Sequence, residues 1–453
     1  MIVVKFGGTS MADAAAITRA GEIVRSRLDR QPIVVVSAFA GVTNQLLQVG
    51  AQAVDGQLVP AMATVQALRE RHLNEAHALA GDTSAGLELA GELSAMIDEL
   101  AALAEALSVL GHGTPRAMDK IAALGEQLSS LVAAAAFQKM GIRARHVDAR
   151  DVMRTNDHFG KAEPQPEAIS EAARRVISPV LRAGDVPLLG GFVGATAQRV
   201  TTTLGRGGSD YSASLIGAAL RAEAIEIWTD VDGMLTADPR IVADAQLIKD
   251  IRFDEASELA SFGAKVLHPS TIAPAVKLGI PVFVFNSRNP RGTGTRITFD
   301  APHRPVTAIA GKKNVTVIKV RSSRMLMAHG VLRRIFEVFE QHRTSVDVVA
   351  TSEVSVSVTI DDTTHLEAVL NDLQPLGDVS VERNRGILAL VGSGMSDDSL
   401  AMARALGALE GARVHMVSLS ASGINLTLIV DGDQVDAGMR RLHAAFFGRQ
   451  VAA

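Results

Sequence analysis

The sequence predicts an α/β protein with an N-terminal domain built around a mainly parallel sheet and two smaller C-terminal modules. Up to about residue 298, short β-branched runs alternate with longer Ala- and Leu-rich stretches, which is the pattern of βαβ units. Beyond that point a strand–helix–strand–strand pattern occurs twice, about 70 residues apart. With 453 residues, the chain is too long for a single core, and several domains are expected.

Five apolar runs are expected to form strands of the first domain, since parallel strands covered on both faces are continuously apolar. They span residues 2–6, 33–37, 186–191, 224–229 and 282–286. Residues 57–110 are rich in Ala, Leu and Glu at helical spacing. This segment is predicted to form a helical hairpin that packs on the sheet domain.

The C-terminal repeat begins after a cluster of turn-forming residues at 286–294, which places the main domain boundary near 298. Each module is too short to bury both faces of a sheet, so the modules are expected to pair within or between chains. In the first module, strands are predicted at 315–320, 346–351 and 354–360 and a helix at 331–342. In the second, strands are predicted at 387–391, 414–419 and 424–430 and a helix at 400–409.

Composition favours a cytoplasmic enzyme that acts on small molecules. The net charge of −4 lacks the cationic excess that binding to nucleic acid or an anionic membrane needs. The chain has no cysteine, which excludes disulfides, thiolate nucleophiles and zinc–cysteine sites. The first apolar run is too short for a secretory signal, and no apolar stretch approaches a membrane span.

Two glycine-rich segments are candidates for anion binding. In the first, Lys5 ends a strand and is followed by Gly7, Gly8 and two hydroxyl residues. Backbone N–H groups at glycines and at a helix start can hold phosphate, and a lysine can neutralise its charge. The same residues also suit a simple strand-to-helix turn with a capping hydroxyl, and this alternative stays open.

The second segment, 201–211, combines three glycines with Arg206, Ser209, Asp210 and three threonines before an Ala-rich helix. A guanidinium can bind a substrate carboxylate through two hydrogen bonds, and Asp210 could orient a substrate amine or the reacting groups. A dinucleotide-binding site is disfavoured because no G-x-G-x-x-G opens the first helix.

Two further motifs lie near the ends of predicted elements. Thr229 and Asp230 close a strand, at the edge where open α/β sheets bind ligands, and an ordinary Asp-Gly turn without a ligand is the less favoured alternative. Lys265 lies in FGAKVLHP, within reach of a nucleotide phosphate, whereas His268 is interpreted as structural. No Ser/His/Asp or histidine-rich metal motif is found, and no metal ligand is assigned. Phosphoryl transfer, with positioning by glycine loops, Lys5 and Mg²⁺, fits these motifs.

In order and spacing, the motifs resemble those of aspartate kinases, which are amino-acid kinases with paired C-terminal ACT domains. They are KFGGTS, SAFAGVTN, GE at 125–126, MRTND, TTTLGRGGSDY, WTDVDG, DPR, FGAKVLHP and SVDVVATSEVSVSVTI. The resemblance covers nearly the whole chain and is closest to the lysine-sensitive type. It implies a kinase domain at 1–298, a first ACT domain of ferredoxin-like α+β type at 312–385, and a second formed by 299–311 and 386–453.

The resemblance also implies the residues that bind the substrates, ATP with Mg²⁺ and L-aspartate. Lys5 and Asp210 would be catalytic, with Lys5 at the transferring phosphate. The aspartate site would contain Thr43, Glu126, Arg206 and Ser209, with Glu126 on the ammonium group and Arg206 on the α-carboxylate. The ATP site would contain Lys5, Gly7, Gly8, Ser37, Thr229, Asp230, Leu235, Arg240, Lys265 and Val266.

Leu235 is a departure from the family pattern. Many lysine-sensitive relatives carry a tyrosine at this position, so a phenolic contact with the nucleotide would be missing here. An apolar contact can take its place, and ATP use is expected to be retained.

In the C-terminal half, the resemblance implies an amino-acid effector site, and lysine is favoured over threonine because two acidic residues belong to it. Ala328 and Val331 depart from lysine-binding relatives, which have a hydroxyl and an aromatic ring there. Val346 and Leu332 could equally be core residues. The implied effector residues are Met325, Ala328, Val331, Leu332, Ser345, Val346, Asp347, Ser352 and Glu353.

Family members insert the first sensing module into the second, so residues 306–311 are expected to pair with the later unit. Pairing between subunits would give a homodimer or a dimer of dimers. Two rival functions stay open: a kinase acting on glutamate, acetylglutamate or a nucleoside monophosphate, and a catalytically silent amino-acid sensor.

Overall fold

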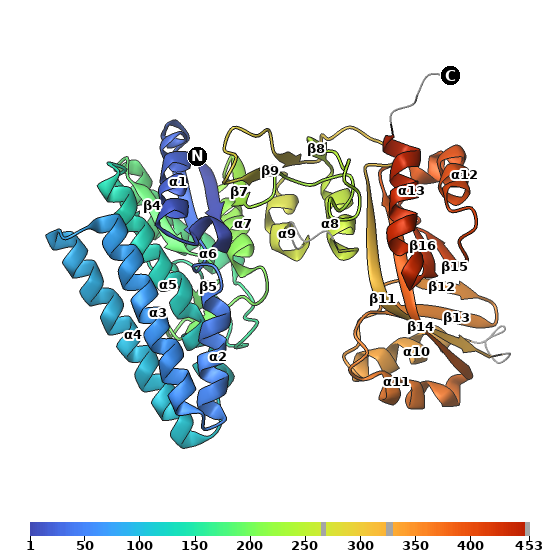
Figure 1. Cartoon of the computed structure of the whole chain (residues 1–453), viewed down its shortest axis with the longest axis horizontal. Helices are drawn as coiled ribbons and strands as arrows, with labels where there is room; N and C mark the ends of the chain where they lie inside the picture. Colours follow the sequence, from blue (N-terminus) through green and yellow to red (C-terminus); the bar gives the residue numbers. More distant parts are fainter. Residues whose placement is uncertain (264–268, 323–328, 449–453) are drawn as a thin grey trace. The chain divides into compact units, whose positions relative to one another are not determined.

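The computed structural model describes residues 1–263, 269–322 and 329–448. Its contacts divide the chain into two compact units, 1–234 with 266–299 and 235–265 with 300–453. The predicted α/β class is confirmed (Figure 1). The domain boundaries inferred from the sequence stay a prediction, and by its contacts the segment 235–265 groups with the C-terminal half.

The sheet of the first unit contains the five predicted strands. They are β1 (Ile2–Phe6), β2 (Pro32–Val36), β4 (Val186–Gly190), β7 (Ala224–Thr229) and β9 (Val282–Asn286). Together with β3 (Ala144–His146) and β10 (Thr295–Ile297) they run in the order β3-β4-β2-β1-β7-β9-β10, and only the β9–β10 pair is antiparallel. Because β1, β2, β4 and β7 are parallel, their carboxyl ends meet at one edge.

Helices pack on this sheet in two groups. In one, α5 (Pro115–Lys139) contacts β2, β3 and β4 and lies beside α1 (Ala14–Arg25) and α2 (Val42–Val54). In the other, α7 (Gly208–Leu220) contacts β1, β2 and β7 and lies beside α6 (Pro166–Arg182) and α9 (Pro269–Lys277). The short hairpin of β5 (Val193–Ala195) and β6 (Thr201–Thr203) leads into α7.

The predicted helical hairpin is formed by α3 (Leu58–Ala80) and α4 (Ser84–Leu110), which lie side by side with α2 and α5 (Figure 1). Buried residues of α4 recur every three or four positions, which gives one apolar stripe. They are Leu89, Leu93, Ile97, Leu100, Ala104 and Leu107. Thr83 caps the start of α4 through its side chain, and Gly111 ends it in a left-handed conformation.

The second unit is built on one antiparallel sheet, in the order β12-β13-β11-β14-β16-β15. Its two central strands, β11 (Ala308–Arg321) and β14 (Asp378–Val391), pair along their whole length, with an irregularity near Lys312. The pairing expected for 306–311 is confirmed, because Ala308 to Lys312 pair with the end of β14. The outer strands are β12 (Val349–Ser352), β13 (Ser355–Ile360), β15 (Val414–Leu419) and β16 (Asn425–Asp431).

Two apolar cores flank this shared sheet. One packs beneath α10 (Val331–Gln341) and α11 (Leu366–Leu373), and the other beneath α12 (Ser399–Ala408) and α13 (Val435–Phe447). The segment with β8 (Asp250–Ile251) and α8 (Phe253–Ser261) belongs to this unit. Thr236, for example, shares a hydrogen bond of 2.9 Å with the buried His443 of α13. Among the described helices, none is both long and apolar enough to cross a membrane.

A buried charge cluster holds β7 in the first unit. Glu226 is 2% exposed and accepts hydrogen bonds from Arg27, Arg30 and the indole N–H of Trp228, each at 3.1 Å. The Arg27 guanidinium also lies over the Trp228 ring. Removal of this carboxylate would leave the Arg27 guanidinium and the buried Trp228 N–H without it, whereas Arg30 would keep its pair with the exposed Glu223.

We therefore predict that Glu226→Ala lowers the free energy of unfolding by about 3 kcal/mol, in chemical denaturation monitored by Trp228 fluorescence. The matched control is Glu223→Ala, since Glu223 is exposed and pairs only with Arg30. Its effect should stay within about 0.5 kcal/mol. Equal effects of the two substitutions would contradict this role of Glu226.

Candidate active site

Two adjoining cavities lie at the carboxyl edge of the first sheet. The larger is about 830 Å³ and the smaller about 410 Å³, and both are lined by Lys5, Gly8 and Asp210. The structure brings most of the predicted substrate residues to the larger cavity. They are Lys5, Gly8, Ser37, Thr43, Glu126, Arg206, Ser209 and Asp210. Gly7, Thr229 and Asp230 line the smaller one.

Lys5 and Asp210 form an ion pair between the two cavities. The Lys5 Nζ lies 2.7 Å from the Asp210 Oδ1, and both side chains are largely buried. Lys5 is fixed by its place in β1, between β2 and β7, and Asp210 by the first turn of α7. The pair therefore fixes the Lys5 ammonium group at the boundary of the cavities.

The loop after β1 is tied to its neighbours at the carboxyl edge of the sheet. Gly7 donates its backbone N–H to the Trp228 carbonyl at 2.9 Å, which ties the loop to the end of β7. A side chain at Gly8 would lie 3.3 Å from the Ala38 carbonyl, so a glycine allows the two loops to approach. Ser37 donates its backbone N–H to the Phe6 carbonyl and joins β2 to the same edge.

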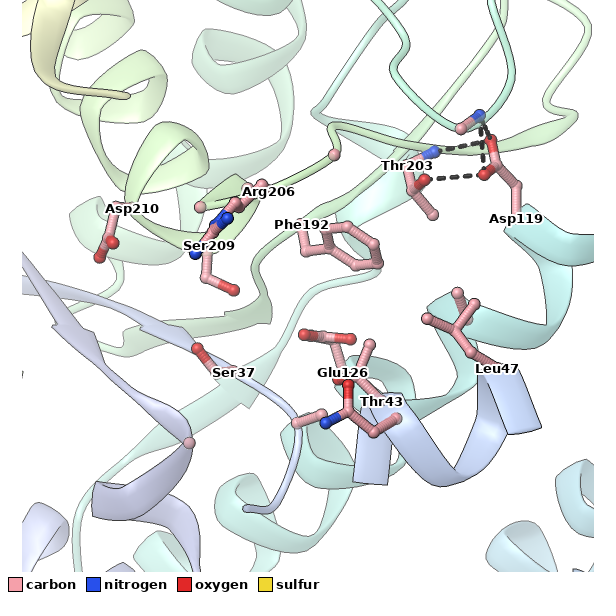
Figure 2. Close-up of a pocket in the computed structure, with 18 of the residues that line it drawn as sticks. Ser37, Thr43, Leu47, Asp119, Glu126, Phe192, Thr203, Arg206, Ser209 and Asp210 are labelled. Carbon is pink, nitrogen blue, oxygen red and sulfur yellow. Dashed lines mark hydrogen bonds between the residues drawn. The ribbon is translucent and has the colours of Figure 1, made fainter. Parts of the chain in front are cut away.

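The second glycine segment forms the turn between β6 and α7. Gly205 and Gly207 have φ angles of 73° and 72°, in the region that favours glycine. Gly207 is the N-cap of α7, so Ser209 and Asp210 lie in its first turn. The Arg206 side chain is exposed and has no ion pair within the described ranges. In Figure 2, Arg206 and Ser209 lie across the pocket from Glu126 and Thr43.

Sequence reasoning missed Gly190, Gly191 and Phe192, which follow one another at the end of β4. A Cβ at Gly190 would lie 2.9 Å from the Glu126 carbonyl oxygen, and one at Gly191 would lie 2.7 Å from the Ser209 Cα. The double glycine is the signal that was available. Phe192 has a φ of 62° and lines the larger cavity, where Figure 2 shows its ring between Arg206 on one side and Thr203 on the other.

Glu126 is the most unusual group of the site. It is 4% exposed, and its Oε2 has no hydrogen-bond partner in the part of the chain that the structure describes. Burial raises the pKa of Glu126 from its ordinary value of 4.5 to about 8, against the opposing effects of backbone N–H groups and the Lys5 charge. A cationic ligand would supply the missing partner and favour the ionised form.

The other four residues predicted for the nucleotide do not belong to the described part of the first unit. Leu235 and Arg240 belong to the second unit, where Leu235 forms a bridge with Leu247 and Arg240 pairs with Asp238 at 2.6 Å. Lys265 and Val266 lie outside the described residues.

The predicted effector residues lie in the second unit. Val331 and Val346 pack on the core beneath α10, whereas Leu332, Ser345, Ser352 and Glu353 are exposed. Met325 and Ala328 lie outside the described residues. Asp347 accepts a hydrogen bond of 3.0 Å from the Lys312 Nζ, which also lies 2.7 Å from Asp361. Burial raises the pKa of Asp347, and the Lys312 ammonium opposes this shift.

Comparison with known proteins agrees with this geometry. Residues 1–286 match the model of the amino acid kinase family, and residues 388–446 match an ACT domain. The chain is 36% identical over 456 residues to the lysine-sensitive aspartokinase 3 of Escherichia coli, covering 99% of both chains. It is 36% identical over 462 residues to the chloroplastic aspartokinase 3 of Arabidopsis thaliana, covering 98% of this chain and 81% of that protein.

Solved structures lead to the same family. The E. coli aspartokinase III in complex with aspartate and ADP matches with a TM-score of 0.86, over 99% of this chain and all (100%) of that one, at 36% identity. Its complex with lysine and aspartate matches with a TM-score of 0.81, over 99% of both chains, also at 36% identity. An aspartate kinase from Clostridium acetobutylicum matches with a TM-score of 0.82 at 26% identity, over 98% of this chain and 100% of that chain. The sheet edge brings together Lys5, Glu126, Arg206 and Asp210, and the E. coli relative matches over 99% of both chains. The chain therefore belongs to the aspartokinases of the amino acid kinase family.

Proposed function

We propose that this chain transfers the γ-phosphoryl group of ATP to the side-chain carboxylate of L-aspartate and that lysine inhibits it. The observation that carries the proposal is the buried Glu126 carboxylate, which lies across the cavity from Arg206 and Ser209 (Figure 2) and whose Oε2 has no hydrogen-bond partner among the described residues. An α-amino acid presents an ammonium group and a carboxylate on one carbon atom, and these two sides of the cavity are complementary to them.

In the proposed complex, Glu126 accepts the substrate ammonium group, and Arg206 binds the α-carboxylate through two hydrogen bonds. The hydroxyls of Thr43 and Ser209 complete the polar lining. The β-carboxylate is then directed toward Lys5, where the cavities adjoin. Positioning of this kind, together with electrostatic stabilisation, supplies almost all of the rate enhancement in phosphoryl transfer.

The reaction forms a bond from a β-carboxylate oxygen to the γ-phosphorus and breaks the bond from that phosphorus to the bridging oxygen of ADP. The products are ADP and the acyl phosphate of aspartate. No general base is needed because the attacking carboxylate is already ionised at neutral pH. Lys5 places its charge beside the transferring group, and Gly7 and Gly8 leave room for phosphate oxygens near the backbone.

The carboxylates of the smaller cavity fit a nucleotide-borne Mg²⁺. No group of three or more potential ligand side chains occurs among the residues that the structure describes. Mg²⁺ is commonly held by one or two carboxylates together with substrate phosphates, and Asp210 and Asp230 line this cavity. When bound, the cation would neutralise charge on the phosphates of ATP.

We also propose that the enzyme is cytoplasmic and works as a homodimer through its C-terminal modules, or as a dimer of dimers. The outer strands β12 and β15 end the six-stranded sheet. Large apolar side chains are exposed nearby, namely Leu332 and Phe336 on α10 and Val417 and Leu419 on β15. Analytical ultracentrifugation of the full chain tests this assembly, and a monomer at micromolar concentration would exclude it.

The substrate claim is tested by ADP release from ATP in the presence of aspartate, glutamate or acetylglutamate. We predict turnover with aspartate, and we predict that Lys5→Ala lowers kcat by roughly 100-fold or more, the loss expected when one charge beside the transferring group is removed. The control is Lys139→Ala, an exposed lysine at the end of α5, which should retain full activity. Turnover with glutamate but not aspartate would overturn the proposal.

The raised pKa of Glu126 predicts a pH dependence of aspartate binding. Below about pH 8 the free carboxyl is protonated, so a bound ammonium group must expel that proton. Consequently kcat/KM for aspartate should rise roughly tenfold from pH 6.5 to 8, and binding at pH 7 should release about one proton. Calorimetry in two buffers of different ionisation enthalpy measures this proton release.

The control variant is Glu126→Gln, which should bind aspartate weakly, with a kcat/KM that does not change with pH and with no proton release. If kcat/KM of this variant rises with pH as steeply as in the wild type, Glu126 is not the titrating group.

The effector claim rests on Asp347, which already accepts the Lys312 ammonium group in this structure. We predict that Asp347→Asn raises the lysine concentration for half-inhibition at least tenfold, about the loss expected for one charge-assisted hydrogen bond. Asp361→Asn is the matched control, because Asp361 also pairs with Lys312 but is not assigned to the effector site. If both variants raise the lysine concentration for half-inhibition equally, Asp347 acts through Lys312 and does not bind the effector. Threonine in parallel assays tests the rival effector.

A further inference from the structure

Asp119, on α5, is a second buried carboxylate in the wall of the larger cavity. It is 3% exposed, and its two oxygens accept hydrogen bonds from the backbone N–H of Gly160 at 2.9 and 3.0 Å. It also accepts from the backbone N–H of Thr203 at 3.0 Å and from the Thr203 hydroxyl at 2.7 Å. Figure 2 shows this group of bonds at one end of the pocket.

These bonds join three segments that are distant in sequence. Asp119 precedes Glu126 by seven residues on α5, so both side chains lie on one face of the helix. Thr203 is the last residue of β6, directly before the glycine turn that carries Arg206. Gly160 lies in a loop that also donates the N–H of Ala162 to the Thr203 carbonyl at 2.8 Å. The carboxylate thereby fixes the start of the glycine turn to the helix that bears Glu126.

Substrate binding depends on that connection. The ammonium group and α-carboxylate of an amino acid are attached to the same carbon atom, so the groups that hold them must keep a fixed separation. One group, Glu126, belongs to α5, and the other, Arg206, belongs to the turn after β6. A displacement of about 1 Å in such an arrangement can cost as much as about 100-fold in rate.

We infer that Asp119 is a positioning residue for aspartate, which sets the distance between Glu126 and Arg206 without contacting the substrate. This inference rests on the proposed function. It predicts a selective effect, because the residues assigned to ATP in the first unit lie at the ends of β1 and β7 or on the loops after β1, β2 and β7, and none of these segments is bonded to Asp119 in the described chain.

The test uses the full chain and two neighbouring substitutions. Thr203→Val removes the hydroxyl that bonds Asp119, and the steady-state KM for aspartate should rise about tenfold, the size expected for one hydrogen bond to a charged group. The KM for ATP should stay within about twofold, and Thr203→Ser should restore the aspartate value. Asp119→Asn, which places an amide N–H against the same donors, should raise the KM for aspartate further.

Thr202→Val is the matched control. Thr202 is equally buried in β6, but its hydroxyl bonds that of Thr155 at 2.7 Å and does not line the cavity. It should lower thermal stability as much as Thr203→Val while leaving both KM values unchanged. The inference about Asp119 would be overturned if the KM for aspartate stayed at the wild-type value in Thr203→Val, or if it rose equally in Thr202→Val. Either result would leave the proposed function intact. A wild-type enzyme without aspartate-dependent turnover would overturn the proposed function together with it.

Discussion

Two consecutive glycines at the carboxyl end of β4 determine how closely the helices on opposite faces of the sheet approach its edge. Successive residues of a strand point to opposite faces, so Gly190 faces α5 and Gly191 faces α7. Either position would clash with its helix if it carried a Cβ atom. Because both side chains are absent, Glu126 and Ser209 reach the same cavity from two different helices. The dimensions of the proposed substrate site depend on this close packing.

Two buried carboxylates on one helix then have different roles because their hydrogen bonding differs. Asp119 receives donors from two loops and is satisfied by the protein itself. Glu126 has an oxygen without a hydrogen-bond partner among the described residues, and burial raises the pKa of its carboxyl group. A buried polar group without a partner costs free energy, which a ligand can recover when it binds. The satisfied carboxylate therefore fits a structural role and the unsatisfied one a binding role.

The sequence predicted the strands of the first sheet well because each is a short apolar run between clear breaks, as at Ile2–Phe6 and Ala224–Thr229. Glu126 could be assigned only through a family resemblance, since one glutamate in an Ala-rich helix carries no local signal. Phe192 was missed because an aromatic residue after a strand is typical of a core. The length of β11 was missed as well, because Lys312, Lys313 and Asn314 interrupt its apolar pattern.

Long-range hydrogen bonds connect the sensing half to a segment that sequence order assigned to the kinase half. Thr236 bonds His443 of α13, and its carbonyl accepts the backbone N–H of Ile309 in β11 at 2.8 Å. The strand β11 continues to Arg321, beside the module that contains Asp347. Leu235 and Arg240, which the resemblance assigns to the nucleotide, therefore belong to the same folded unit as the proposed effector residues. The backbone hydrogen bond from Ile309 to Thr236 fixes this segment to β11 within one packed unit.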